Sequence, residues 1–204
     1  MTLSRSPAER ALLIVDASVV INLNATGRAG AIIAALPQRM AVPQNACREL
    51  ADGARFGHDD ARRLEEMIEA DMLDRIEMGA AAVAVFETLI DGSARTTLDD
   101  GEAAAIACAV ERAAVAVLDE RKARRLCAAA FPALAVASTA ALLLHKDVAA
   151  ALGPSAHVET MVMALQRGRM RVPPEHIDEV CALIGPDLAA ACPSLPRATR
   201  RAGS

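Results

Sequence analysis

Four acidic residues stand at places in the sequence where a fold could gather them. Asp16 and Asp119 each end a run of apolar residues that is typical of a buried strand. Ligands of an open parallel sheet bind at the carboxyl ends of its strands, so these two acids could face one crevice. Glu49 and Glu102 lie near helical patterns that flank those strands. We therefore expect all four carboxylates to share one site.

Carboxylates crowded into one crevice need a counter charge. Without a cation they repel one another, and some of them become protonated. Hard oxygen ligands select Mg²⁺ or Mn²⁺ rather than zinc. Such an ion can polarise a phosphodiester and lower the pKa of an attacking water molecule. The acids therefore predict metal-assisted hydrolysis of a phosphodiester.

Several other chemistries lack their sequence signals. The chain has no G-x-G-x-x-G after its first apolar run, no G-x-x-x-x-G-K-[ST] and no G-x-S-x-G. Its five cysteines form no C-x-x-C and its four histidines show no ligand spacing, so a zinc site is not expected. A phosphohydrolase that acts on a small molecule would often carry D-x-D at a strand end, whereas Asp16 is followed by Ala17 and Ser18.

The elements that must position these acids alternate along the chain. Apolar runs predict strands at residues 11–15, 40–42, 115–118 and 134–137, and residues 72–78 fit either a strand or a frayed helix end. Helical patterns cover a stretch ending near Leu36, then 44–51, 59–70, 80–89, 99–113, 120–130, 139–152, 155–167 and 174–184, with a break at Gly92-Ser93. This alternation predicts an α/β fold in which a parallel sheet is sandwiched between helices.

Three segments follow from this pattern. Residues 10–152 are predicted to form the catalytic domain, because they hold all the strands and all four acids. Residues 153–190 carry only helical patterns and are predicted to form a C-terminal helical extension. Residues 191–204 are rich in Pro, Arg and Ser, and a flexible tail is expected there.

Four motifs in order resemble those of the PIN-domain ribonucleases, especially the VapC-like branch with a G-E-A-x-A-I-A and a D-[DE]-x-x-A-R segment. The resemblance spans about residues 11–152. The motifs are LIVDAS at 13–18 with INL at 21–23, VP at 42–43 with REL at 48–50, DGEAAAIA at 100–107, and VLDERKAR at 117–124.

The resemblance implies an Mg²⁺- or Mn²⁺-dependent endoribonuclease, and in many relatives the toxin of a toxin-antitoxin pair. Its catalytic acids would be Asp16, Glu49, Glu102 and Asp119. The metal ligands would come from Asp16, Glu102 and either Asp119 or Glu120, because adjacent residues point to different sides. The resemblance also implies an RNA substrate, a homodimer and a small antitoxin protein.

Charge and composition bear on how RNA would be bound. Residues 61–120 hold five Lys or Arg against fourteen Asp or Glu, whereas the remaining residues hold seventeen against twelve. Aromatic residues are scarce, which disfavours recognition by base stacking. Two groups of basic residues could contact phosphates or simply be solvated, and Arg124 could instead pair with a neighbouring carboxylate and orient it. The basic residues are Arg121, Lys122, Arg124 and Arg125 in the first group, and Arg167, Arg169, Arg171, Arg197, Arg200 and Arg201 in the second.

Three further expectations complete the sequence analysis. Ser18 could hold a water or an acid in the site, or simply cap a helix. The odd cysteine count and the absence of a leader pattern indicate the reducing cytoplasm, and no apolar run is long enough to span a membrane. The main alternative to an enzyme is a PIN-like module that binds RNA or a protein without catalysis.

Overall fold

The computed structural model describes residues 12–55, 57–91 and 98–196, which form two compact units. The first unit comprises residues 1–17, 37–118 and 122–137, and the second comprises residues 18–36, 119–121 and 138–204, within the described ranges. The predicted break at Gly92-Ser93, residues 10–11 of the predicted domain and residues 197–204 of the predicted tail lie outside the described residues.

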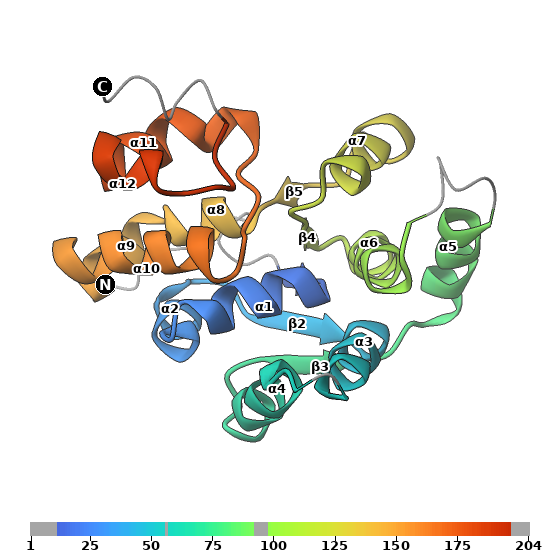
Figure 1. The fold of residues 1–204 in the computed structure, drawn as a ribbon. Helices are drawn as coiled ribbons and strands as arrows, with labels where there is room; N and C mark the ends of the chain where they lie inside the picture. Colours follow the sequence, from blue (N-terminus) through green and yellow to red (C-terminus); the bar gives the residue numbers. More distant parts are fainter. Residues whose placement is uncertain (1–11, 56, 92–97, 197–204) are drawn as a thin grey trace, which may run out of the picture. The chain divides into compact units, whose positions relative to one another are not determined.

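The first unit contains a parallel sheet, which confirms the predicted α/β class (Figure 1). The strands stand in the order β3-β2-β1-β4-β5. Their bounds are β1 Leu13–Val15, β2 Met40–Pro43, β3 Asp74–Ile76, β4 Val115–Val117 and β5 Val136–Ala137. The ambiguous 72–78 segment is therefore a strand. All three side chains of β1 are buried, as expected for a central strand with neighbours on both sides.

One helix of the first unit fixes the position of a predicted catalytic acid. Helix α6 (Asp100–Arg112) packs against β1, β2 and β4, and every residue from Gly101 to Ala109 is buried. Most of these residues are alanines, whose small side chains let the helix approach the sheet closely. The start of α6, where Glu102 lies, is thereby held against the central strands.

Four other helices complete the first unit. Helix α3 (Gln44–Ala54) packs against α4 (Asp60–Glu69) and α6, and α5 (Ala80–Ile90) also packs against α6 (Figure 1). Helix α7 (Arg121–Ala130) follows β4 in the chain. Glu111, near the end of α6, accepts hydrogen bonds from the backbone amides of Gly79 and Ala82 at 3.2 and 3.1 Å, and so caps the start of α5.

The second unit is helical. Its helices are α1 Ala17–Ala25, α2 Ala29–Ala35, α8 Thr139–Leu143, α9 Lys146–Leu152, α10 Pro154–Gln166, α11 Ile177–Ile184 and α12 Pro186–Ala190, with a 3-10 turn, η2, at Pro174–His176. Residues 18–36 thus group with the residues after 138. The predicted boundary at residue 152 remains a prediction.

Two long helices expected from the sequence are each divided in two. The stretch before Leu36 breaks between α1 and α2, where Gly27 has a φ of 69°. The stretch 139–152 breaks at His145, whose extended backbone lets its ring accept a hydrogen bond from the Asp147 amide at the start of α9. Both breaks depend on local backbone geometry rather than on apolar periodicity, which continues across them.

Within the described residues, no individual helix has the length and apolar character needed to cross a membrane, although α9 and α10 together, bent by 114°, pass on length and composition.

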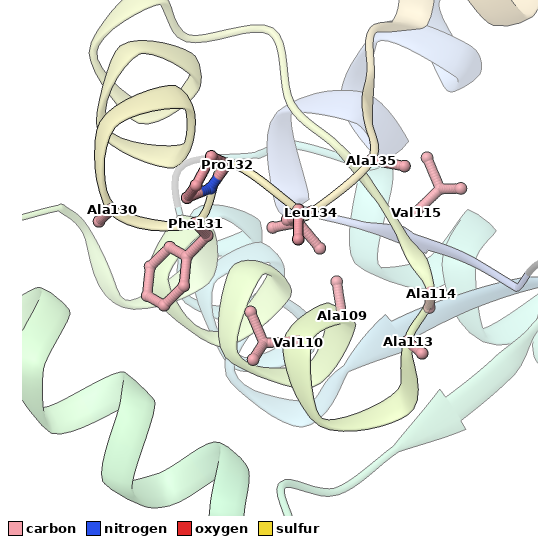
Figure 2. A pocket seen from close by; sticks show the side chains of 11 residues that line it. Ala109, Val110, Ala113, Ala114, Val115, Ala130, Phe131, Pro132, Leu134 and Ala135 are labelled. Atoms are coloured by element: carbon pink, nitrogen blue, oxygen red, sulfur yellow. The ribbon is translucent and has the colours of Figure 1, made fainter.

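An apolar pocket lies at the amino-terminal ends of β4 and β5, whereas the candidate acids follow the carboxyl-terminal ends of the strands. It has a volume of about 550 Å³ and is lined by the end of α6, the start of β4 and the connection from α7 to β5. Figure 2 shows Val110, Phe131 and Leu134 among the side chains that line it. Since no acidic, basic or hydroxyl side chain lines it, this pocket offers no group for hydrolysis.

Candidate active site

Asp16 comes directly after β1, as the sequence predicts. The residue is only 2% exposed. Its position at the carboxyl end of the central strand follows from the apolar run Leu13–Val15, which is buried between β2 and β4. A buried carboxylate at this edge is where a parallel sheet gathers its ligands.

Glu102 lies in the first turn of α6 and is 7% exposed. Asp99 caps the helix, because its Oδ1 accepts a hydrogen bond from the Glu102 amide at 2.8 Å. Burial raises the pKa of Glu102 to about 7, helped by the negative charges of Asp99, Asp16 and Glu49, while a hydrogen bond from the Asp99 backbone opposes the shift. The negative charges of all three neighbouring acids therefore act on Glu102.

The exchange of bonds between Asp99 and Glu102 is a capping box, in which each side chain bonds the other residue's backbone. This arrangement explains why the helix starts at Asp100 and orients the Glu102 side chain. A capping box is a structural role, but it does not require a buried carboxylate beside Asp16. The burial and the acidic neighbours distinguish Glu102 from an ordinary first-turn acid.

The Glu49 side chain extends from α3 to the start of α6, where Glu102 lies. Its Oε2 lies so close to Gly101 that a Cβ on that glycine would collide with it. Partial burial of its carboxylate, followed by the charges of Asp99 and Asp100, raises the pKa of Glu49 above its ordinary value. The first unit therefore brings together three of the predicted catalytic acids, namely Asp16, Glu49 and Glu102.

The donor set of these residues suits a hard divalent cation. All the donors are carboxylate oxygens. Burial is the main cause of the raised pKa values of Glu49 and Glu102, and neighbouring negative charges, which a cation would offset, add to it. In the part of the chain that the structure describes, no three Asp, Glu, His or Cys side chains are arranged to enclose an ion. Mg²⁺ commonly keeps several waters and contacts one or two carboxylates. Asp16 and Glu102 fit such a partly hydrated ion.

Asp119 belongs to the second unit, where hydrogen-bond donors surround it. The residue is 6% exposed. Asn22 Nδ2 donates to its Oδ2 at 2.7 Å, and Thr139 donates from its amide to Oδ1 at 2.8 Å and from its hydroxyl to Oδ2 at 2.6 Å. Glu120, by contrast, forms an ion pair with Arg171. The choice between Asp119 and Glu120 as metal ligand remains a prediction.

Asn22, Thr139 and Asp99 bond the candidate acids, and none of them was predicted to do so. Asn22 lies in a motif used for the family resemblance, but nothing local indicates that it bonds a residue 97 positions later. Thr139 lies at the start of a predicted helix, a position where a hydroxyl ordinarily serves as a cap. Asp99, three residues before a glutamate, carries a recognisable capping-box signal.

Arg124 has a structural role in the first unit. Its Nη1 donates to the carbonyl oxygens of Leu118 and Ala137, at 3.3 and 2.9 Å. These bonds link the ends of β4 and β5, a role that the sequence did not predict. Arg197, Arg200 and Arg201 of the predicted basic tail lie outside the described residues.

The parallel sheet and its flanking helices define an α/β protein, and buried acids follow its strands. A family model described as a PIN domain (DUF3368) matches residues 12–186. The chain belongs to the PIN domain family. Membership indicates a nuclease-type function, and PIN domains typically use divalent metals. No curated protein and no solved structure matches the chain.

Proposed function

We propose that this protein is an Mg²⁺- or Mn²⁺-dependent endoribonuclease of the VapC-like branch. The observation that carries the proposal is the convergence of Asp16 and Glu49 on the buried Glu102, whose pKa is raised to about 7 by burial first and then by the charges of Asp99, Asp16 and Glu49. A fold gains no stability from mutually repelling carboxylates. Their retention at the ligand-binding edge of the sheet is explained by a cation and a phosphodiester substrate.

A role is proposed for each of the four acids. Asp16 and Glu102 would hold the cation, which supplies charge neutralisation and a more acidic water when bound. Glu49, more exposed than the other two, would orient the attacking water in line with the leaving oxygen. Asp119 is proposed as a further ligand, and its support is the sequence. It follows the run that contains β4, as Asp16 follows the run that contains β1.

A role as the toxin of a type II toxin-antitoxin pair is proposed on the family resemblance. That role brings with it a homodimer, an RNA substrate and a small antitoxin. A cytoplasmic location is supported by the five cysteines, all of which are free thiols. Expression of the chain should arrest growth, and co-expression of a small neighbouring open reading frame should restore it.

The direct test is cleavage of a mixed RNA pool with Mg²⁺, Mn²⁺ or EDTA. The Asp16→Asn and Glu102→Gln variants should each lose at least about 100-fold in rate, because each removes a negative oxygen ligand. The matched controls are Asp52→Asn and Glu87→Gln, which change exposed acids on α3 and α5 and should cleave as the wild type does.

Two results would count against the enzyme. Cleavage that persists in EDTA, or that is unchanged in both variants, would falsify the metal-dependent mechanism. RNA binding without cleavage in any metal would favour the alternative, a non-catalytic PIN-like module.

A further inference from the structure

The Asp119 carboxylate is held by two buried side chains of the second unit. Asn22 is 4% exposed and Thr139 is fully buried. Thr139 anchors the carboxylate through its own backbone and hydroxyl at the start of α8. Asn22 reaches it from α1 through a single bond of 2.7 Å. Asn22 is therefore one of two side chains that orient the carboxylate, and the one that comes from a different helix than Thr139.

The Asn22 side chain lies close to the turn that follows α10. A Cβ placed on Gly168 would lie 2.6 Å from Asn22 Oδ1 and 2.8 Å from the Ala164 carbonyl oxygen. Both separations are far shorter than a normal van der Waals contact, and the carbonyl is backbone that does not move easily. Gly168 thus leaves the space that the Asn22 amide occupies.

The same turn contacts the residue next to Asp119. Arg171 pairs with Glu120, whose side chain is 36% exposed. The turn is fixed between these contacts by the Met170 amide, which bonds the Ala164 carbonyl at 3.0 Å, and by burial of Met170 to 1% exposure. The segment 168–171 therefore lies close to the Asn22 amide that bonds Asp119, and it pairs with Glu120 through Arg171.

We propose that Asn22 is a positioning residue for the Asp119 carboxylate. The 168–171 turn, through Gly168 and Arg171, sets the position of that carboxylate. This gives the predicted C-terminal extension a role in orienting Asp119. The inference rests on the proposed function, in which Asp119 is a metal ligand. Groups that orient a metal ligand from behind commonly change metal affinity by 10- to 100-fold when they are removed.

The test measures Mn²⁺ binding by isothermal titration calorimetry together with RNA cleavage, on the full chain. Asn22→Ala and Asn22→Leu remove the donor, and the leucine keeps the volume. Each should weaken Mn²⁺ binding at least about tenfold. Gly168→Ala removes no polar group, and it should weaken Mn²⁺ binding about threefold or more because the added methyl displaces the Asn22 amide. Arg171→Met should have the smallest effect, because its ion pair is half-exposed.

Two control variants separate positioning from general damage. Thr26→Val removes a buried hydroxyl that bonds the Leu23 carbonyl within the same unit, and Gly53→Ala adds a methyl where nothing lies within 4 Å. Both should bind Mn²⁺ within twofold of the wild type, even if Thr26→Val lowers the melting temperature as much as Asn22→Leu does.

The outcomes distinguish the two proposals. Wild type that binds Mn²⁺ and cleaves, with Asn22→Leu and Gly168→Ala unchanged in both, overturns this inference alone. Wild type that neither binds nor cleaves overturns the proposed function and this inference with it. If both Asn22 variants fail to fold, Gly168→Ala decides the matter: weaker Mn²⁺ binding at an unchanged circular dichroism spectrum supports the role, and wild-type binding refutes it.

Discussion

Two buried carboxylates of this protein, those of Glu102 and Asp119, have opposite surroundings. Glu102 is surrounded by other acids, and its pKa is raised to about 7. Asp119 accepts hydrogen bonds from Asn22 and from Thr139. Burial alone therefore does not reveal what a carboxylate does. The negative charge of Glu102 would be stabilised by an added cation, whereas hydrogen-bond donors of the protein already stabilise the negative charge of Asp119.

The largest expected effect on stability comes from Asp119→Ala. Removing the carboxylate leaves two donors on Thr139 and one on Asn22 without their acceptor, and an unsatisfied buried donor costs about 1–3 kcal/mol. We expect a loss of about 3 kcal/mol or more in the free energy of unfolding, measured in urea. Asp52→Asn, at an exposed position, should change it by less than about 0.5 kcal/mol. A loss below about 1 kcal/mol for Asp119→Ala would contradict the structure of this site.

Glu102→Gln, unlike Asp119→Ala, should raise the free energy of unfolding at alkaline pH. A folded pKa of about 7 against about 4.5 when unfolded means that the native state binds the proton more tightly. Stability from this group is therefore greatest below pH 4.5 and falls as the pH rises towards 7. At pH 8 without metal, Glu102→Gln should be more stable than the wild type by about 2 kcal/mol. The gain should disappear near pH 4.5.

Urea unfolding at pH 4.5, 6 and 8 measures this difference between the two proteins. Taking the difference cancels the titration of groups that both proteins share. A constant difference across the three pH values would show that Glu102 has an ordinary pKa, and that the acids of the first unit do not repel as described.

The pattern that predicts an acid is local, and the pattern that predicts its partners is not. Asp16 was found because the three apolar residues before it form a buried strand. Glu102 was found because an acid in a first helical turn beside an alanine-rich run is visible in the sequence. The bond from Asn22 to Asp119 joins residues 97 positions apart, and no short-range pattern encodes it.

The same limit applies to the fold. Alternating apolar and helical patterns predicted the parallel sheet, because each strand is a short run that the core must bury. The division of residues 139–152 into two helices escaped prediction, because it depends on the backbone of one residue, His145. A grouping of residues 18–36 with the residues after 138 depends on long-range packing.

The smallest expected effect comes from Gly101→Ala. The added methyl would collide with the Glu49 carboxylate, which is at the flexible end of its side chain and can move away. Stability should change by less than about 1 kcal/mol, because the side chain can adjust. Cleavage should fall severalfold, since Glu49 is displaced from the other acids. Gly53→Ala, on the same helix as Glu49, is the control for cleavage. Equal cleavage rates for the two alanine variants would show that Glu49 is not part of the active site.

The central claim is that the acids of the first unit converge and are relieved by a cation. Titration of the Glu102 side-chain carboxyl carbon by NMR, with and without Mg²⁺, tests it most directly. We predict a pKa of about 7 without Mg²⁺ and a value at least one unit lower when Mg²⁺ is present. A pKa near 4.5 in both conditions, or a raised value that Mg²⁺ leaves unchanged, would contradict the account.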